Sequence, residues 1–405
     1  MNKIISKVLG NKYEDLWKYV IRPEKDDYTL DELGPVKFKH NQKLFKRTDL
    51  TLTNKRNLKL CCSFWEPEER KYPKLPCVIY LHGNSSSRTE IFPELYYLLS
   101  SDITVFAFDF SGCGKSEGEY ISLGWYERDD VECVVEYLRS TNKVATIGLW
   151  GRSMGAVTAI MYGDRDPSIA GLVLDSPFCS LKVLTEELAK EKAASIPNFI
   201  LNKGVQMIRE TIKEKAKFDI NDIEPKVYAE RCFIPALFCH GLDDTFVNVH
   251  HCKDLYEVYA GDKNVTYVEG DHNSQRPNYF LDSVAIFFYN SLHVENLKEL
   301  NYGDKIGDIK NIHLNNEEEN KNESNNNNNN KNDNSNANLN NNNNNDNKDI
   351  NNNNPNNNMN VNNNYNQNNN DPNAFVFHFD EYGGYGQESE EEILKRVLEL
   401  SKKEF

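Results

Sequence analysis

Short apolar runs alternate with longer segments of helical periodicity over residues 38–290. Runs such as 76–81 and 144–150 are too short for helices and contain few polar residues, which is typical of strands buried inside a sheet. The apolar run at 156–162 carries alanines and predicts a buried helix. Strands that alternate with helices in this way predict an α/β fold with a mostly parallel central sheet and flanking helices.

The pattern is different ahead of this region. Residues 1–37 contain one helical segment near 13–21, so we expect an N-terminal helical arm that packs on the body. Two strand-like runs then follow, at 47–53 and 58–65. They flank the polar turn 54–57, which predicts an antiparallel hairpin at the start of the α/β domain.

A helical insertion interrupts the alternation at 180–231. Its two segments with helical periodicity, 181–194 and 199–217, are separated by Pro197, because proline does not continue a helix. We interpret the insertion as a small helical cap. Two ordinary surface helices are the alternative.

Asparagine dominates residues 313–372. Such a segment cannot bury enough apolar surface to offset the conformational entropy of an ordered chain, so we expect a disordered Asn-rich linker over 296–386. The α/β domain then covers 38–295. An acidic run followed by an apolar helix face predicts a short amphipathic helix at 387–405.

Charge and cysteine content narrow the class of protein. The net charge is −15 and no basic cluster stands out, so we do not expect nucleic-acid binding. The nine cysteines include no Cys-x-x-Cys pair, which indicates a reducing, cytoplasmic location with neither a zinc site nor a disulfide framework. We also expect no transmembrane segment and no signal peptide, because no window is long and apolar enough.

The segment Gly151-Arg152-Ser153-Met154-Gly155 joins a predicted strand to a predicted helix. A serine at so sharp a turn has a strained backbone, and glycines on both sides leave room for the strand and helix to cross. We expect an exposed Ser153 hydroxyl at the positive end of the helix, where the Met154 N–H can meet an anion.

Residues that suit serine catalysis follow two later strand-like runs. Asp243 and Asp244 come after an apolar strand that ends in His-Gly, and either carboxylate could orient an imidazole. His272 follows a short β-branched strand, on a loop from which it could reach back over the sheet. His250 and His251 begin a predicted helix and are interpreted as surface or packing residues.

The chain order Ser153, Asp244, His272 is that of the α/β-hydrolases. Residues 38–293 resemble the serine aminopeptidase-like branch of that superfamily, which also contains depalmitoylating proteins. Two further motifs carry the resemblance, the glycine-rich loop at 109–118 and the Leu-Asp-Ser-Pro-Phe segment at 174–178.

The resemblance implies specific roles for several residues. The branch pattern His-Gly-x-x-Asp puts the acid at Asp244, which leaves Asp243 as a solvated loop residue. The loop after the 76–81 strand supplies the second oxyanion N–H in this superfamily, from Asn84 or Ser85 here, beside that of Met154. The superfamily also places a cap over the active site where this chain has its insertion. No metal or cofactor is implied.

The final helix resembles a ubiquitin-interacting motif. An acidic cluster precedes Leu394 and Ser401, but Val397 stands where that motif has alanine. The bulkier valine would weaken binding by overpacking the contact. A generic charged helix is the alternative.

Together these features predict a serine hydrolase that cleaves an acyl ester or thioester, in a small molecule or an acylated protein. A serine peptidase of the same branch is one alternative. A ubiquitin-binding adapter with a non-catalytic hydrolase fold, or an inactive scaffold, is another.

Overall fold

The computed structural model describes residues 17–18, 20–192, 198–298 and 301. Most of the predicted linker lies outside these residues. The whole predicted C-terminal helix also lies outside them, with Leu394, Val397 and Ser401. The disorder of the linker and the ubiquitin-like contact therefore stay predictions.

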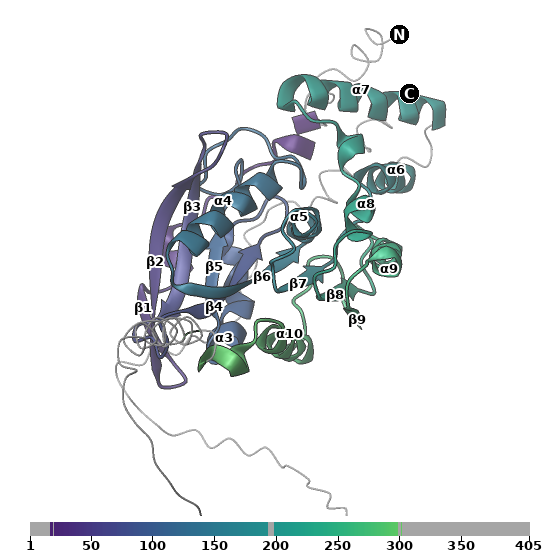
Figure 1. The fold of residues 1–405 in the computed structure, drawn as a ribbon. Coiled ribbons are helices and arrows are strands. Elements are labelled where there is room, and N and C mark those ends of the chain that lie inside the picture. Colours follow the sequence, from purple (N-terminus) through teal and green to yellow (C-terminus); the bar gives the residue numbers. More distant parts are fainter. Residues whose placement is uncertain (1–16, 19, 193–197, 299–300, 302–405) are drawn as a thin grey trace, which may run out of the picture. The chain divides into compact units, whose positions relative to one another are not determined.

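The described residues form one nine-stranded sheet with the strand order β1-β2-β3-β5-β4-β6-β7-β8-β9 (Figure 1). The strands are β1 (Lys37–His40), β2 (Lys43–Thr53), β3 (Lys59–Pro67), β4 (Leu75–Leu81), β5 (Thr104–Phe108), β6 (Val144–Arg152), β7 (Gly171–Asp175), β8 (Ala236–Gly241) and β9 (Lys263–Val268). From β5 onward in this order all neighbours are parallel, whereas β1, β2 and β3 pair antiparallel. The predicted fold class and the predicted hairpin, now β2 and β3, are confirmed.

Helices cover both faces of the sheet. They are α3 (Phe92–Ser100), α4 (Glu127–Ser140), α5 (Met154–Gly163), α6 (Leu181–Lys192), α7 (Asn198–Ala216), α8 (Pro225–Ala229), α9 (Val249–Val258) and α10 (Asn278–Ser291), with 3-10 turns η1 (Leu30–Leu33), η2 (Arg88–Ile91), η3 (Ile220–Asp222) and η4 (Val294–Asn296). Buried side chains of α3 and α10 share one apolar cluster, and those of α4, α5, α8 and α9 share the other. The sheet therefore separates two cores, as a mostly parallel sheet requires.

Strand β4 shows how the apolar pattern builds these two cores. All seven of its residues are buried. Successive side chains of a strand point to opposite faces, so Ile79 and Leu81 join the core under α4 and α5 while Val78 and Tyr80 join the core under α3 and α10. A continuous apolar run is thus what a strand covered on both sides needs.

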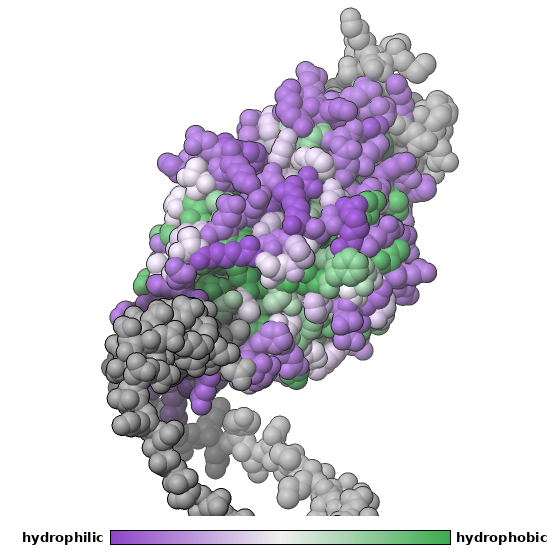
Figure 2. Space-filling model, in the orientation of Figure 1, coloured by the Kyte–Doolittle hydropathy of each residue, from purple (hydrophilic) through white to green (hydrophobic). Residues whose placement is uncertain are grey.

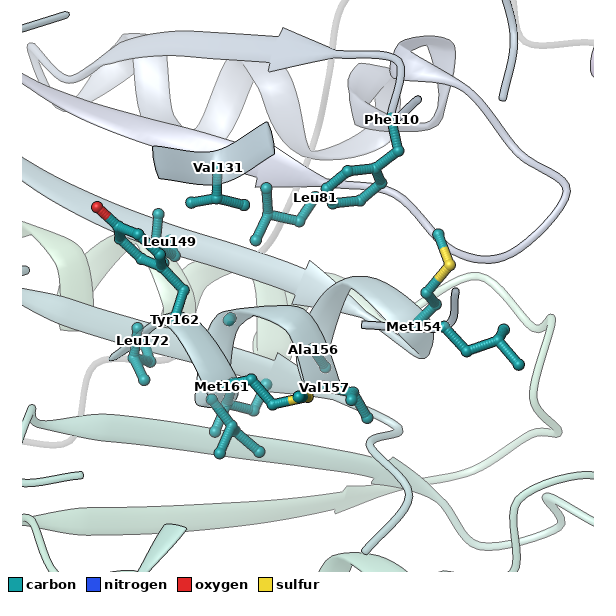
Figure 3. Packing of buried hydrophobic residues seen from close by; sticks show 14 of the residues in the cluster. Leu81, Phe110, Val131, Leu149, Met154, Ala156, Val157, Met161, Tyr162 and Leu172 are labelled. Carbon is teal, nitrogen blue, oxygen red and sulfur yellow. The ribbon is translucent and has the colours of Figure 1, made fainter. Parts of the chain in front are cut away.

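Helix α5 is buried along its whole length. Figure 3 shows its side chains Ala156, Val157 and Met161 among residues of neighbouring strands such as Leu149 and Leu172. A helix with no solvent-facing side has no polar stripe, and this explains why the sequence shows only an unbroken apolar run here.

The predicted insertion lies between β7 and β8 as α6, α7, η3 and α8. In Figure 1, α6 and α7 lie at the end of the molecule away from α3 and α10. Ile212 and Ala216 of α7 are buried in the same core as α5, so the insertion packs on the body.

Hydrophilic residues cover most of the face shown in Figure 2, and an apolar strip crosses its middle. No helix within the described ranges is long and apolar enough to cross a membrane.

Glycine positions give a direct test of this packing. A Cβ on Gly204, inside α7, would meet nothing within 4 Å. We expect Gly204→Ala to stabilise the protein by about 0.5–1 kcal/mol, because alanine loses less conformational entropy in a helix. A Cβ on Gly148 of β6 would lie 2.6 Å from the buried Phe288 ring, so Gly148→Ala should destabilise by about 1–3 kcal/mol. Chemical denaturation measures both changes, and a destabilising Gly204→Ala would contradict the helix.

Candidate active site

Ser153 occupies a sharp turn between the end of β6 and the start of α5. Its φ of 51° and ψ of −115° are unusual for a residue with a side chain. A Cβ on Gly155 would lie 1.9 Å from the Leu81 carbonyl oxygen, and one on Gly151 would lie 2.3 Å from the Gly155 backbone. The close crossing of strand and helix that the sequence predicts is therefore present, and only glycine fits at either position.

Three side chains from separate loops form one hydrogen-bonded chain. His272 Nε2 lies 3.0 Å from Ser153 Oγ, and His272 Nδ1 lies 2.7 Å from Asp244 Oδ2. Ser153 is only 8% exposed, whereas the sequence predicts an exposed hydroxyl. The imidazole that bonds the hydroxyl contributes to this cover.

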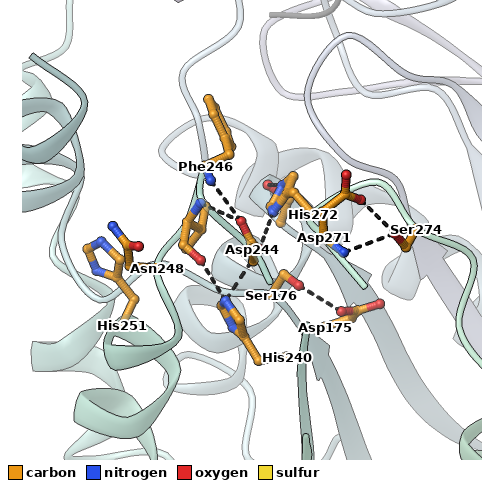
Figure 4. Close-up of polar contacts among 12 residues, drawn as sticks. Asp175, Ser176, His240, Asp244, Phe246, Asn248, His251, Asp271, His272 and Ser274 are labelled. Atoms are coloured by element: carbon orange, nitrogen blue, oxygen red, sulfur yellow. Dashed lines mark hydrogen bonds and ion pairs between the residues drawn. The ribbon is translucent and has the colours of Figure 1, made fainter. Parts of the chain in front are cut away.

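The Asp244 carboxylate faces hydrogen-bond donors of four residues (Figure 4). Its Oδ1 accepts hydrogen bonds from the N–H groups of Phe246 at 3.0 Å and Val247 at 2.7 Å. His240 Nε2 lies 3.3 Å from Oδ2 and 2.6 Å from the Val247 carbonyl oxygen, so one N–H is shared between them. Burial alone would raise the pKa of Asp244, but the hydrogen bonds from His240, His272 and Val247 hold it well below its usual range.

The other two candidate aspartates make different contacts. Asp243 accepts a hydrogen bond from the Gly270 N–H at 3.2 Å and lies at the surface. Asp175 is buried and pairs with Arg276 through two hydrogen bonds of 2.8 and 2.9 Å. Only Asp244 contacts His272, which is the choice that the branch pattern implies.

Arg276 is a site residue that the sequence analysis missed. Besides Asp175, its guanidinium donates to the carbonyl oxygens of Asp271 at 3.2 Å and Ser274 at 3.1 Å, on the loop that carries His272. Burial would raise the pKa of Asp175, but the charge and hydrogen bonds of Arg276 lower it overall. No local motif marks this pair, because its members are 101 residues apart.

The two predicted oxyanion donors come from different loops, Met154 from the start of α5 and Asn84 from the loop after β4. Met154 is the first residue of α5, so its N–H has no acceptor within the helix. His82 accepts from the Phe110 N–H at 3.1 Å through Nε2, and its Nδ1–H therefore donates to the Gly83 carbonyl at 2.7 Å. Because a trans peptide is planar, a fixed Gly83 carbonyl also fixes the opposite direction of the Asn84 N–H.

The glycine-rich loop at 109–118 is built around a buried carboxylate. Asp109 accepts hydrogen bonds from the Tyr28 hydroxyl at 2.7 Å and from the N–H groups of Arg88 and Lys115 at 2.8 Å each. A Cβ on Gly114 would lie 2.6 Å from that carboxylate, and the Gly114 φ of 43° also favours glycine. Asp109 therefore joins the 109–118 loop to the segments that contain Tyr28 and Arg88.

A second polar cluster lies where α6 meets α9. Glu187, His250 and His251 have ligand atoms within 4.8 Å of one another, so they could hold a metal ion. The sequence analysis interpreted both histidines as surface or packing residues. His251 is indeed buried, but it also faces the Glu187 carboxylate, which the sequence analysis did not predict. Glu187 gives no signal in the sequence, because it is one of several acidic residues on α6.

Comparisons with known proteins agree with this architecture. The family described as Serine aminopeptidase, S33 matches residues 73–220. YqkD of Bacillus subtilis is 29% identical over 201 residues, 48% of this chain and 64% of that protein. The monoglyceride lipase of Mus musculus is 28% identical over 175 residues, 42% of this chain and 56% of the lipase. The chain thus spans less than two thirds of the length of both relatives.

A solved structure matches a larger share of the chain. The esterase Pf2001 of Pyrococcus furiosus has a TM-score of 0.51 and 25% identity, and the match covers 67% of this chain and 97% of the esterase. The nine-stranded, mostly parallel sheet, the strand-serine-helix turn and these matches agree on one architecture: the chain has the α/β-hydrolase fold.

Proposed function

We propose that the protein is a serine hydrolase that cleaves acyl esters through a covalent acyl-enzyme. The observation that carries the proposal is the hydrogen-bonded chain from Ser153 through His272 to Asp244, with its serine on a strained turn between strand and helix. Such an arrangement makes a serine hydroxyl nucleophilic by placing a base within hydrogen-bond reach.

The reaction follows from the atoms that these distances join. Ser153 Oγ attacks the acyl carbonyl carbon while His272 Nε2 takes the hydroxyl proton. The carbonyl oxygen becomes an oxyanion and accepts hydrogen bonds from the Asn84 and Met154 N–H groups. As the oxyanion collapses, the bond to the leaving alcohol breaks, and His272 returns the proton to that alcohol. Water, deprotonated by His272, then cleaves the acyl-enzyme by the same route.

Asp244 fixes which nitrogen of His272 faces the serine. Its Oδ2 accepts from Nδ1, so the neutral imidazole presents an unprotonated Nε2 to Ser153. The lowered pKa of Asp244 keeps the carboxylate ionised at neutral pH, where it also stabilises the imidazolium that forms in the transition state.

An ester is the substrate class with the most support. An esterase and a monoglyceride lipase are among the similar proteins, by their names. The matched family is described as a serine aminopeptidase, which keeps peptide cleavage as the second candidate. A thioester on a small molecule or an acylated protein uses the same chemistry and remains a prediction from the sequence.

A substrate panel separates these classes. Purified protein is tested against p-nitrophenyl acyl esters, an acyl-coenzyme A thioester and aminoacyl p-nitroanilides, beside labelling with a fluorophosphonate probe. We expect labelling of the wild type, none of Ser153→Ala, and the highest kcat/KM on an ester. Labelling that survives Ser153→Ala would overturn the assignment of the nucleophile, and preferred cleavage of the anilide would favour the peptidase.

Two expectations beyond the site stay predictions. The cytoplasmic location rests on cysteine usage alone. Ubiquitin binding by Leu394, Val397 and Ser401 rests on a sequence resemblance, and those residues lie outside the described part of the chain.

Ser153→Ala and His272→Ala should each lower the turnover of a p-nitrophenyl ester about a thousandfold or more. The double variant should be little slower than either single one, because the two residues act as one unit. Steady-state kinetics of the three variants, all checked for native circular dichroism, measure this. Additive losses would contradict a shared proton-transfer step.

Asp244→Asn and Asp243→Asn form a matched pair on neighbouring residues. We expect the Asp244 variant to have a kcat about a hundredfold below that of the Asp243 variant, because only Asp244 sets the tautomer of His272. The kcat of both is measured on the same ester. Equal effects would show that the contact with His272 is not used in catalysis.

Arg276→Gln tests the positioning of the histidine loop. Loss of the guanidinium leaves the buried Asp175 carboxylate without its charged partner, which should cost about 3–5 kcal/mol of stability. At temperatures where the variant is folded, we expect kcat to fall more than KM rises, because His272 loses its anchored loop. Arg231→Gln is the control, since Arg231 makes a similar two-bond pair with Asp164 at the surface and should change little. Equal effects of both substitutions would contradict the anchoring role.

A further inference from the structure

Polar side chains meet between α6 and α9. Glu187 on α6 faces two consecutive histidines at the start of α9, His250 and His251. The proposed hydrolysis does not use any of the three. Glu187 belongs to the helical insertion and the two histidines belong to the body. An interaction that links the three side chains therefore also holds α6 against α9.

The three side chains have the spacing of metal ligands. His250 Nε2 lies 2.8 Å from Glu187 Oε1, and His251 Nε2 lies 3.2 Å from Glu187 Oε2. The two imidazoles are stacked at 29° with centroids 4.3 Å apart, and both direct Nε2 to the Glu187 carboxylate. Ligand atoms at the usual distances around a tetrahedral zinc ion are about 3.3 Å apart, so small shifts would admit an ion.

The buried histidine lacks the hydrogen bond that an ordinary ion pair would give it. His251 has no exposed surface, and its Nε2 has no hydrogen-bond partner even though a Glu187 oxygen lies 3.2 Å away, because the two groups are not aligned for one. A buried polar atom without a partner is costly. A metal ion between the nitrogen and the carboxylate would satisfy both groups.

Each histidine also has a polar group behind its other ring nitrogen. His250 Nδ1 lies 3.8 Å from Asp254 Oδ2. His251 Nδ1 lies 3.1 Å from Cys179 Sγ and 3.4 Å from the Cys179 backbone nitrogen, whose N–H points at it. The Asn248 amide approaches Glu187 Oε2 at 3.5 Å. A metal-binding histidine donates its outer N–H and binds the ion through the other, unprotonated nitrogen. Zinc binding therefore requires the tautomer in which His251 Nδ1–H donates to Cys179 Sγ and Nε2 carries no proton.

We propose that Glu187, His250 and His251 bind a zinc ion that clamps α6 to α9. Two imidazoles and one carboxylate suit zinc, which takes such nitrogen and oxygen ligands and can complete a tetrahedron with water. The His250 side chain is 42% exposed, which gives the ion and that water a path from solvent.

The clamp would act on the acid loop as well as on the insertion. Asn248 precedes α9 directly, and the loop before it contains the Phe246 and Val247 N–H groups that hold Asp244. Figure 4 shows His251 and Asn248 on one side of Asp244 and His272 on the other. A bound ion therefore stiffens the segment that supports the triad acid, without touching the reacting atoms.

Zinc binding to the tag-free full chain tests the proposal. The metal-stripped wild type is titrated with zinc chloride by calorimetry, and its melting temperature is measured with and without one equivalent of zinc. We expect one tight site and a higher melting temperature with zinc. Glu187→Gln and His250→Asn should each weaken that site at least tenfold and abolish the shift. His250 is partly exposed, so this variant is expected to fold.

His293→Asn is the matched control, because His293 is an exposed histidine next to Glu295 and far along the chain from the cluster. It should bind zinc like the wild type. Titration of fluorophosphonate-labelled protein excludes binding at His272, and its site should be unchanged. The proposal is overturned if the wild type binds no zinc, or if Glu187→Gln and His250→Asn bind it as well as His293→Asn does. Since binding is measured without turnover, a failure of the clamp is distinct from a failure of the esterase assignment.

Discussion

The crossing of α5 over the end of β4 is the constraint on which the rest of this structure depends. Gly155 lies so close to the Leu81 and His82 carbonyl oxygens that no side chain fits between them. That contact forces the chain to turn within one residue, and Ser153 takes a backbone conformation that few residues adopt. The strain is tolerated because α5 is buried along its whole length and β6 lies inside the sheet. The core therefore holds the serine at the carboxyl edge of the parallel strands, where loops from other strands meet it.

Buried charges then hold those loops. Asp109 gathers N–H and hydroxyl donors from three segments, Asp175 binds Arg276 on the histidine loop, and Asp244 accepts two N–H groups of its own loop. An ionised carboxylate is expensive to bury unless its oxygens are satisfied, so each of these positions permits only one arrangement of the surrounding backbone. Hydrogen bonds to buried carboxylates thus position the loops of the site, and apolar packing around α5 positions Ser153.

The sequence predicted the features of this structure that depend on short sequence segments. Strand and helix order and the elbow can be read from runs of a few residues, because periodicity and turn chemistry act over that range. The choice of Asp244 over Asp243 came from the resemblance to the α/β-hydrolase branch. The pair of Asp175 and Arg276 could not be predicted, since its members lie on different elements 101 residues apart. The contact of His251 with Glu187 was missed for a related reason. Nothing in the pattern at the start of α9 shows that a helix of the insertion lies over it.

The loop that follows Asp244 combines a local sequence motif with contacts to distant parts of the chain. Between Asp244 and α9 the chain is tied to the site, because Phe246 and Val247 donate to the acid and Phe246 also packs on the His272 ring, with centroids 5.1 Å apart. Any shift of α9 relative to the sheet would therefore be passed to the carboxylate that orients the imidazole. In the proposed mechanism, a contact between α6 and α9 consequently affects catalysis even though it touches no reacting atom. The position of the helical insertion and the geometry of Ser153, His272 and Asp244 are therefore coupled.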